Sequence, residues 1–143
     1  VLATILRAGL PLHQGLLNYF DTADNSFISA FRKYSKDGSF HIELEYISCP
    51  NLENRTLILC DPMLATGSSI ILAYRALLSN GMPKHVHVVT VVASKEGIKN
   101  IQKNIDTRNV TIWAAAVDEE LTVKSYIVPG IGDAGDLAYG SKI

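Results

Sequence analysis

The 143-residue sequence lacks several features that would define its class directly. It has two cysteines, Cys49 and Cys60, without a CxxC spacing, which favours reduced thiols in a cytoplasmic protein over a disulfide framework. Its longest apolar runs have the length of a buried strand, well short of the ~20 residues of a membrane-spanning helix. Residues 1–6 have neither a basic region before them nor a cleavage signature after them, so we do not expect a signal peptide there.

The sequence also has no excess of either charge. Thirteen Lys and Arg residues against fourteen Asp and Glu residues give a formal net charge of −1, so nothing in the composition predicts binding to nucleic acid or to an anionic membrane. Among the four histidines, His85 and His87 share one face of a predicted strand but have no third ligand nearby, and no metal site is predicted. No Ser-His-Asp or Cys-His arrangement can be argued. Small-molecule partners are therefore the expectation.

What the chain does have is an alternation of strand and helix patterns. Apolar runs predict strands at residues 1–5, 57–60, 85–93 and 110–117, and helical spacing predicts helices at 10–18, 69–79 and 94–105. Residues 26–31 and 40–47 flank the turn signal Lys36-Asp37-Gly38 and predict a β-hairpin. Trp113, on the last strand, is expected in the core. We predict one α/β domain over residues 1–143, with a mainly parallel sheet and helices on both faces.

The most informative segment follows the strand at residues 57–60. Asp61 comes directly after the strand, and Thr66-Gly67-Ser68-Ser69 leads into a helix. A loop of small residues at a helix N-terminus presents backbone N–H groups and the positive end of the helix dipole, which suits an anion. A carboxylate beside it can accept hydrogen bonds from sugar hydroxyls. The segment predicts a site for a phosphorylated sugar.

Two further segments could contribute to the same site. Arg7 and Gly9 follow the first strand, and Arg7 supplies a permanent cation suited to phosphate oxygens. The stretch from Tyr126 to Asp136 holds three glycines within six residues, whose backbone groups could read a flat heterocycle, although a plain surface turn would have the same composition. In parallel sheets, ligands bind beyond the carboxyl ends of the strands, where Arg7 and Asp61 are both predicted.

The motifs resemble those of the uracil phosphoribosyltransferase family. Asp61-Pro62-Met63-Leu64-Ala65-Thr66-Gly67-Ser68-Ser69 is similar to the family's phosphoribosyl pyrophosphate loop. Ile5-Leu6-Arg7-Ala8-Gly9-Leu10 and Tyr126-Ile127-Val128-Pro129-Gly130-Ile131-Gly132-Asp133-Ala134-Gly135-Asp136 resemble its other two signatures, in the same order. One acid followed by Pro, as at Asp61-Pro62, distinguishes the uracil branch from relatives with two adjacent acids.

The resemblance implies a type I phosphoribosyltransferase fold with a β-hairpin arm and an incomplete hood. It implies a transferase of pyrimidine salvage that converts uracil and phosphoribosyl pyrophosphate to UMP and pyrophosphate, with Mg²⁺ carried by the pyrophosphate and no metal ligand of the protein's own. Asp61, Arg7 and Asp133 would be catalytic. Phosphoribosyl pyrophosphate would contact Arg7, Arg32, Asp61, Pro62, Met63, Leu64, Ala65, Thr66, Gly67, Ser68, Ser69 and Asp133. Uracil would contact Tyr126, Ile127, Gly132, Asp133 and Ala134.

Two departures from the family pattern define open questions. Ser68 stands where the family usually has glycine, and a positive φ at that position would be strained by the serine Cβ. Family members also carry several dozen residues before the first strand, with part of the hood and of the dimer contacts, so we expect this chain to be N-terminally truncated and a homo-oligomer. A phosphoribosyltransferase for another base, or a catalytically idle nucleotide-sensing or RNA-binding regulator, remains an alternative.

Overall fold

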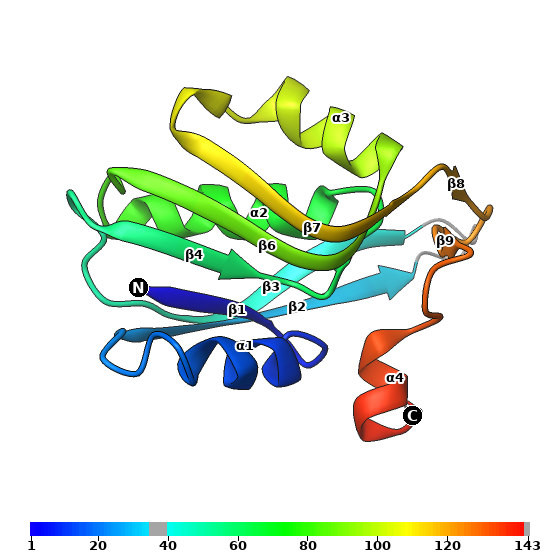
Figure 1. Cartoon of the computed structure of the whole chain (residues 1–143), viewed down its shortest axis with the longest axis horizontal. Coiled ribbons are helices and arrows are strands. Elements are labelled where there is room, and N and C mark those ends of the chain that lie inside the picture. Colours follow the sequence, from blue (N-terminus) through cyan, green and yellow to red (C-terminus); the bar gives the residue numbers. More distant parts are fainter. Residues whose placement is uncertain (35–39, 142–143) are drawn as a thin grey trace.

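The computed structural model describes residues 1–34 and 40–141, with side chains for residues 1–30 and 42–141. The strands are β1 (Leu2–Leu6), β2 (Asn25–Tyr34), β3 (Phe40–Ser48), β4 (Thr56–Cys60), β5 (Met63–Leu64), β6 (His85–Ser94), β7 (Val110–Asp118), β8 (Glu120–Leu121) and β9 (Ile127–Val128). The α-helices are α1 (Leu10–Leu17), α2 (Ser68–Leu77), α3 (Lys95–Asn104) and α4 (Ala134–Tyr139), with 3₁₀ turns η1 (Leu78–Asn80) and η2 (Thr107–Asn109). Figure 1 shows how they are arranged around one large sheet.

The order of the strands determines where the helices lie. The main sheet runs β3-β2-β1-β4-β6-β7, with β5 also on β6, and every pair is parallel except β2 with β3. The chain steps in one direction from β1 to β2 and in the opposite direction from β4 through β6 to β7. Because parallel crossovers are right-handed, α1 lies on one face of the sheet and α2 and α3 on the other (Figure 1). The predicted parallel sheet with helices on both faces is confirmed.

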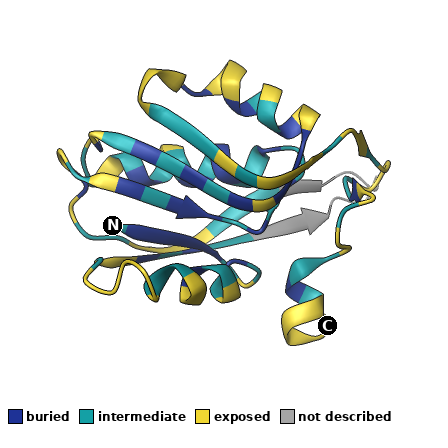
Figure 2. Ribbon diagram, viewed as in Figure 1, coloured by how far each residue is buried: buried dark blue, intermediate teal, exposed yellow. Residues whose placement is uncertain are grey.

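The core lies along the central strands. Ala3 on β1, Leu57 and Leu59 on β4, and Val88 on β6 are almost inaccessible to solvent, and Leu77 of α2 packs with them. Figure 2 shows the same concentration of buried residues along β1, β4 and β6. Each fully buried leucine stabilises the fold by roughly 2 kcal/mol relative to exposure. These strands form a rigid base from which the loops at their carboxyl ends project.

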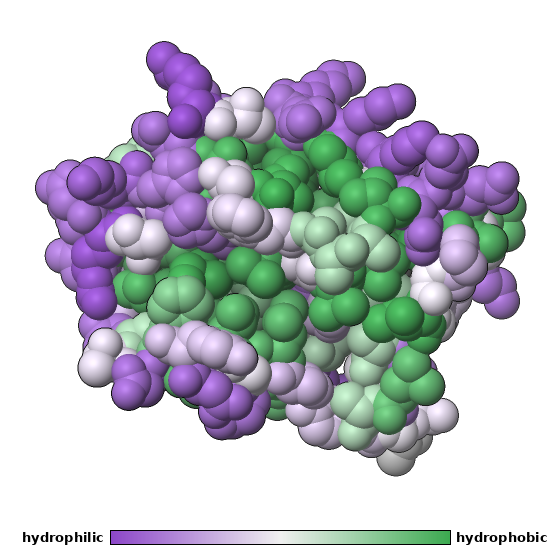
Figure 3. All heavy atoms as spheres, in the orientation of Figure 1, coloured by the Kyte–Doolittle hydropathy of each residue, from purple (hydrophilic) through white to green (hydrophobic). Residues whose placement is uncertain are grey.

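One part of the sheet remains exposed, and it overturns the expectation for Trp113. The side chain is 57% exposed, as Val117 and Val91 are at 48% and 37%. Alternation along β7 places Ile112 and Ala114 against the core and Trp113 on the opposite side, next to Val89 of β6. Figure 3 shows the apolar surface that results on this face. Trp113 is therefore a surface residue that donates a hydrogen bond to His87 at 3.1 Å.

The remaining predicted elements agree with the structure except in the C-terminal part. β2 and β3 form the expected antiparallel hairpin, while the turn Lys36-Asp37-Gly38 lies outside the described residues. The segment after Asp118, for which the sequence pattern predicts neither strand nor helix, contains the short strands β8 and β9 and the helix α4. The sequence also gave no sign of β5. Within the described ranges, no helix is long and apolar enough to span a bilayer.

Candidate functional site

The candidate site lies where the strand order reverses direction. β1 and β4 are parallel neighbours, and Arg7 and Asp61 follow directly after them. After β1 the chain continues to α1 on one face of the sheet, and after β4 it continues to α2 on the other face. A crevice therefore opens between the two loops that follow these strands. A cavity of about 600 Å³ occupies this position, lined by both residues. In Figure 1 the arrows of β1 and β4 point toward the side of the molecule where β9 and α4 lie.

Asp61 is a strongly perturbed carboxyl in this cavity. Burial raises its pKa to about 7, and the Met63 N–H, 3.4 Å from Oδ1, opposes the shift only in part. Pro62 has no N–H to offer. A carboxyl with few donors of its own is available to accept hydrogen bonds from a ligand's hydroxyls, and such a ligand would favour its ionised form.

The segment from Asp61 to Gly67, called here the Asp61 loop, turns sharply into α2. Gly67 is the residue before the helix and adopts φ +79°, a conformation that glycine tolerates without strain. Ser68 is the first residue of α2 and does not have a positive φ, so the strain that such a conformation would cause does not arise. Gly67 offers no capping side chain, and Thr66 Oγ1 accepts the Ser68 N–H at 3.4 Å, so the next N–H groups of the first turn of α2 are left for an anion.

Helix α3 supports this loop from behind. Ser94 Oγ donates to the Ala65 carbonyl oxygen at 2.5 Å and accepts from the Gly97 N–H at 2.8 Å, and Asn100 Nδ2 donates to the Thr66 carbonyl oxygen at 2.7 Å. The Ser94 cap was predictable from its position before an amphipathic helix. Nothing in the sequence pattern indicated that Asn100 reaches the loop. These bonds hold the loop backbone before any ligand binds.

Arg7 is positioned by the opposite end of the chain. Its guanidinium donates to Asp136 Oδ1 and to the Gly140 carbonyl oxygen, both at 3.3 Å. The Arg7 and Asp136 side chains are 40% and 37% exposed, so water screens the ion pair. The pair keeps the cation at the cavity edge without satisfying all five of its N–H groups. The sequence singled out Arg7 but not its partner Asp136.

The stretch from Tyr126 to Asp136, called here the glycine-rich segment, closes the cavity on the side away from the sheet. Asp118 Oδ2 accepts from the Gly130 N–H at 2.9 Å, and Met63 Sδ accepts from the Ala134 N–H at 3.4 Å. Asp133 caps α4 by accepting from the Asp136 N–H at 2.9 Å. The segment thus reaches the cavity through contacts with both β7 and the Asp61 loop.

The cavity brings together most of the predicted site residues. Those that line it are Arg7, Asp61, Met63, Ala65, Ser69, Tyr126, Gly132, Asp133 and Ala134. Those that do not are Pro62, Leu64, Thr66, Gly67, Ser68 and Ile127. Leu64 and Ile127 are buried in the protein and fix the backbone instead. Arg32 belongs to β2, but its side chain lies outside the described residues.

Further residues line the cavity that the sequence did not single out. They are Ile5, Leu6, Ala8, Ser29, Ala30, Ile42, Ser125 and Gly135. Ser29, Ala30 and Ile42 come from the base of the hairpin, and only the pairing of β2 with β1 places them there. The hairpin pattern predicted the two strands but not their distance from the site.

Metal-binding capacity in the cavity is limited to single carboxylates. Within residues 1–34 and 40–141, no three His, Cys, Asp or Glu side chains converge as a ligand set. Asp61 and Asp133 both line the cavity. Mg²⁺ commonly binds through one or two carboxylates together with substrate phosphates, and this donor set fits such an ion.

Comparison with known proteins identifies the family. The family model for uracil phosphoribosyltransferase matches residues 1–141. The chain belongs to the uracil phosphoribosyltransferase family. A uracil phosphoribosyltransferase of Porphyromonas gingivalis is 55% identical over all 143 residues, and one of Methanothermobacter thermautotrophicus is 38% identical over 140 residues, 98% of this chain. The chain spans 66% and 62% of the lengths of these two relatives.

Solved structures place the fold in the same group. The AQ2163 protein of Aquifex aeolicus superposes with a TM-score of 0.87 at 34% identity, covering 99% of this chain and 65% of that one. A purine phosphoribosyltransferase of Pyrococcus horikoshii gives a TM-score of 0.57 at 15% identity, covering 85% of this chain and 78% of that one. The second likeness shows only the fold. The family member described here has the type I phosphoribosyltransferase fold that its motifs implied.

Proposed function

We propose that this chain transfers the phosphoribosyl group of phosphoribosyl pyrophosphate to uracil, giving UMP and pyrophosphate, as a step of pyrimidine salvage. One observation carries the proposal. Arg7, Asp61 and the segment from Tyr126 to Ala134 come from three distant parts of the chain and line one cavity at the reversal of strand order. A cation, a hydroxyl-binding acid and a backbone-rich loop are the groups that a phosphorylated sugar and a flat base require.

The sugar phosphate is assigned to the Asp61 loop. Asp61 accepts hydrogen bonds from the ribose hydroxyls, and the backbone from Ala65 to Ser69 binds the 5′-phosphate at the N-terminus of α2. The bonds from Ser94 and Asn100 fix this backbone in advance. Such preorganisation lowers the entropy that binding costs and aligns the anomeric carbon.

The pyrophosphate is assigned to the opposite side of the cavity. Arg7 and Arg32 stabilise the negative charge that grows on the leaving group, and Asp133 contacts the phosphoribosyl pyrophosphate. Mg²⁺ carried by the pyrophosphate would neutralise part of its charge, bound chiefly through phosphate oxygens and water, with the Asp61 and Asp133 carboxylates in the same cavity. Arg7 would exchange its contacts with Asp136 and Gly140 for the ligand's oxygens.

Uracil is assigned to the glycine-rich segment. Backbone groups of Ile127, Gly132 and Ala134 read its alternating donors and acceptors, and Tyr126 packs on its ring. A uracil nitrogen forms the bond to the anomeric carbon as the bond from that carbon to the pyrophosphate oxygen breaks, and the leaving group takes the electron pair. The nitrogen loses its proton to water or to the departing pyrophosphate as the new bond forms, so the acidity of uracil replaces a protein base.

The decisive experiment combines catalysis with binding. UMP formation is followed by chromatography with uracil, phosphoribosyl pyrophosphate and Mg²⁺, with other bases offered in parallel, and UMP binding is measured by calorimetry. We expect uracil to be the only one of the offered bases that is converted to a nucleotide. We also expect the chain to bind UMP, and Asp61→Ala to weaken that binding. Turnover of a different base would exclude the uracil assignment. Binding of phosphoribosyl pyrophosphate without turnover of any base would favour an idle sensor.

We also propose a cytoplasmic location and assembly into a homo-oligomer. Cys49 and Cys60 are free thiols, which suits a reducing compartment. The apolar face around Trp113 supports assembly, because soluble monomers rarely expose a large contiguous apolar patch. Sedimentation equilibrium of the purified chain tests the assembly.

A further inference from the structure

Two side chains with similar roles lie next to each other at the carboxyl ends of β6 and β7. Ser94 is the last residue of β6, Asp118 is the last residue of β7, and the two residues are paired across the parallel strands. Ser94 Oγ donates to the Ala65 carbonyl oxygen of the Asp61 loop. Asp118 Oδ2 accepts from the Gly130 N–H at 2.9 Å. Neighbouring positions of the sheet therefore hold the two segments that enclose the active-site cavity.

The bond between Asp118 and Gly130 closes the hairpin that β8 and β9 form. The ladder of these strands ends at the pair of Glu120 with Val128, and Pro129 has no N–H with which to continue it. The Asp118 side chain accepts the following N–H instead, and a carboxylate accepts a stronger hydrogen bond than a neutral oxygen does. Asp118 thus fixes the point at which the glycine-rich segment leaves the hairpin.

The backbone beyond this bond does not restrict its own conformation. Gly130 and Gly132 have φ of +54° and +81°, and glycine adopts positive φ about as readily as negative φ. A Cβ added at Gly132 would meet no atom within 4 Å, so neighbouring atoms leave that residue room to move. Farther along, the Ala134 N–H donates to Met63 Sδ, a weak acceptor, at 3.4 Å. The orientation of this backbone therefore depends on the bond from Asp118.

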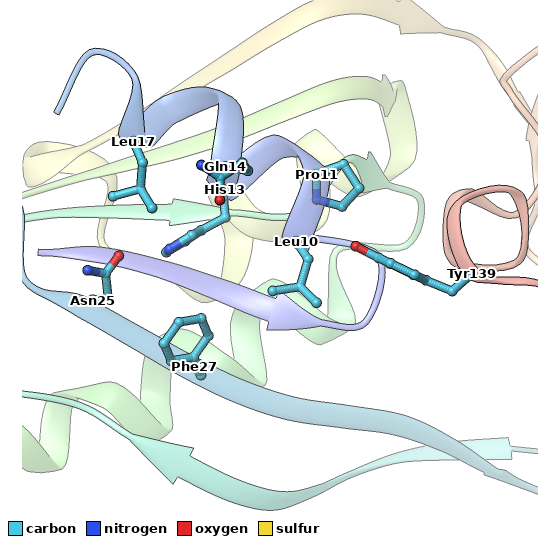
Figure 4. Close-up of a pocket in the computed structure, with 8 residues that line it drawn as sticks. All are labelled: Leu10, Pro11, His13, Gln14, Leu17, Asn25, Phe27 and Tyr139. Carbon is cyan, nitrogen blue, oxygen red and sulfur yellow. The ribbon is translucent and has the colours of Figure 1, made fainter. Parts of the chain in front are cut away.

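Helix α4 anchors the other end of the segment. Tyr139 lines a second cavity together with residues of α1, and Figure 4 shows its ring extending from α4 toward Leu10. Residues 132–134 lie between Gly130 and the body of α4 and line the active-site cavity, whereas Asp118 does not. Asp118 can therefore influence a ligand only through the backbone that it holds.

We propose that Asp118 is a positioning residue for the base, which orients residues 131–134 through Gly130 and so sets the affinity of the chain for uracil. This inference rests on the proposed function. The effect on phosphoribosyl pyrophosphate is smaller, because its 5′-phosphate is assigned to the loop that Ser94 holds. Since the two strands are roughly 4.8 Å apart, the pair of Ser94 and Asp118 also fixes the spacing between the sugar and the base.

Steady-state kinetics of Asp118 variants test this role. Asp118→Leu keeps a branched side chain that cannot accept a hydrogen bond, and it should raise KM for uracil about tenfold while KM for phosphoribosyl pyrophosphate changes less than about threefold. Asp118→Asn keeps an acceptor oxygen and should bring KM for uracil back to within about threefold of the wild-type value. If Asp118→Leu does not fold, Asp118→Ser takes its place, because the shorter hydroxyl cannot reach Gly130.

A spectroscopic measurement checks the bond itself. In ¹H–¹⁵N spectra of the chain, the Gly130 amide should exchange with solvent faster in Asp118→Leu and Asp118→Ser than in the wild-type chain or in Asp118→Asn. Glu119→Gln is the matched control, because Glu119 follows Asp118 directly but pairs with Lys95 at the surface, outside the cavity. It should leave both KM values and the Gly130 amide unchanged.

The outcomes separate this inference from the proposed function. Wild-type turnover of uracil together with an unchanged KM for uracil in Asp118→Leu would overturn the inference alone. Equal changes of both KM values would also overturn it, because a general loss of structure has that effect. A wild-type chain that does not convert uracil would remove the proposed function, and the inference with it.

Discussion

The two segments that enclose the candidate active site are held in very different ways. The Asp61 loop is fixed by short hydrogen bonds from α3 and by the close approach of Gly97, whose added Cβ would lie 2.9 Å from the Leu64 carbonyl oxygen. The glycine-rich segment is held by its β9 pairing with β8, by hydrogen bonds between Thr122 and Tyr126, by one carboxylate and one thioether sulfur, and by one exposed ion pair. The loop assigned to the phosphate is thus preorganised, while the segment assigned to the base is held by weaker contacts.

For the proposed reaction, this difference suits an ordered binding of the two substrates, the phosphorylated sugar first and the base second. A rigid anion site captures the charged substrate with little loss of entropy. A segment with few tethers can open for the base and close over it, because contacts of low stability are the ones that break locally. Three pairs of variants test the contrast.

The largest effect is expected at Asp61, which the rigid loop holds in a half-buried position where its carboxyl is desolvated. Its carboxyl titrates near 3.8 when unfolded and near 7 when folded, so the folded chain binds the proton more tightly. As pH rises through this interval, the wild-type chain loses stability relative to Asp61→Asn, by at most about 4 kcal/mol above pH 7. Urea unfolding from pH 4 to pH 8 measures the difference.

Asp106→Asn is the control for this measurement. Hydrogen bonds from Arg108 lower the pKa of Asp106 to about 2, so its carboxylate stabilises the fold above its unfolded pKa and loses that effect only as pH falls toward 2. The stability difference between the wild-type chain and Asp106→Asn should therefore stay constant as pH rises from 5 to 8. Equal pH profiles for the two variants would contradict the assignment of a strained carboxyl to Asp61.

The next largest effect is expected from adding a methyl group at Gly97, which packs against the Asp61 loop from α3, or at Gly132 within the glycine-rich segment. Gly97→Ala forces a Cβ against the Ala65 carbonyl oxygen and should destabilise the chain by about 3 kcal/mol. Gly132→Ala meets no atom within 4 Å, but its φ of +81° should cost about 1 kcal/mol. Denaturant unfolding of both variants gives the comparison, and a larger loss at Gly132 would reverse the order of rigidity.

The smallest effects concern single tethers. Asn100→Ala removes the bond to the Thr66 carbonyl and should cost about 1 kcal/mol, whatever the salt concentration. Asp136→Ala removes the exposed ion pair with Arg7 and should cost less than about 0.5 kcal/mol. High salt should abolish the second effect alone, since it screens exposed charges. Thermal unfolding with and without salt separates the two, and equal losses would remove the contrast between the segments.

Much of the fold could be predicted because each pattern was local. The apolar runs before Arg7 and Asp61 defined two strands, and small residues after Asp61 indicated a helix N-terminus. Trp113 was predicted wrongly because apolar character does not reveal which side of an edge strand a helix will cover. The helix α4 was missed because Gly and Asp residues mark turns as readily as helix caps.

The α/β class, the acid and the cation at two strand ends, and the order of the three motifs could all be predicted from the amino-acid sequence. These follow from periodicity and from residue chemistry, which act over a few positions. The contact of Asn100 with the Asp61 loop, the bond from Arg7 to Asp136 across 129 positions, and the burial of His13 without a partner became visible in the folded chain alone. Each depends on which surfaces the packed sheet brings together, and no local pattern encodes that.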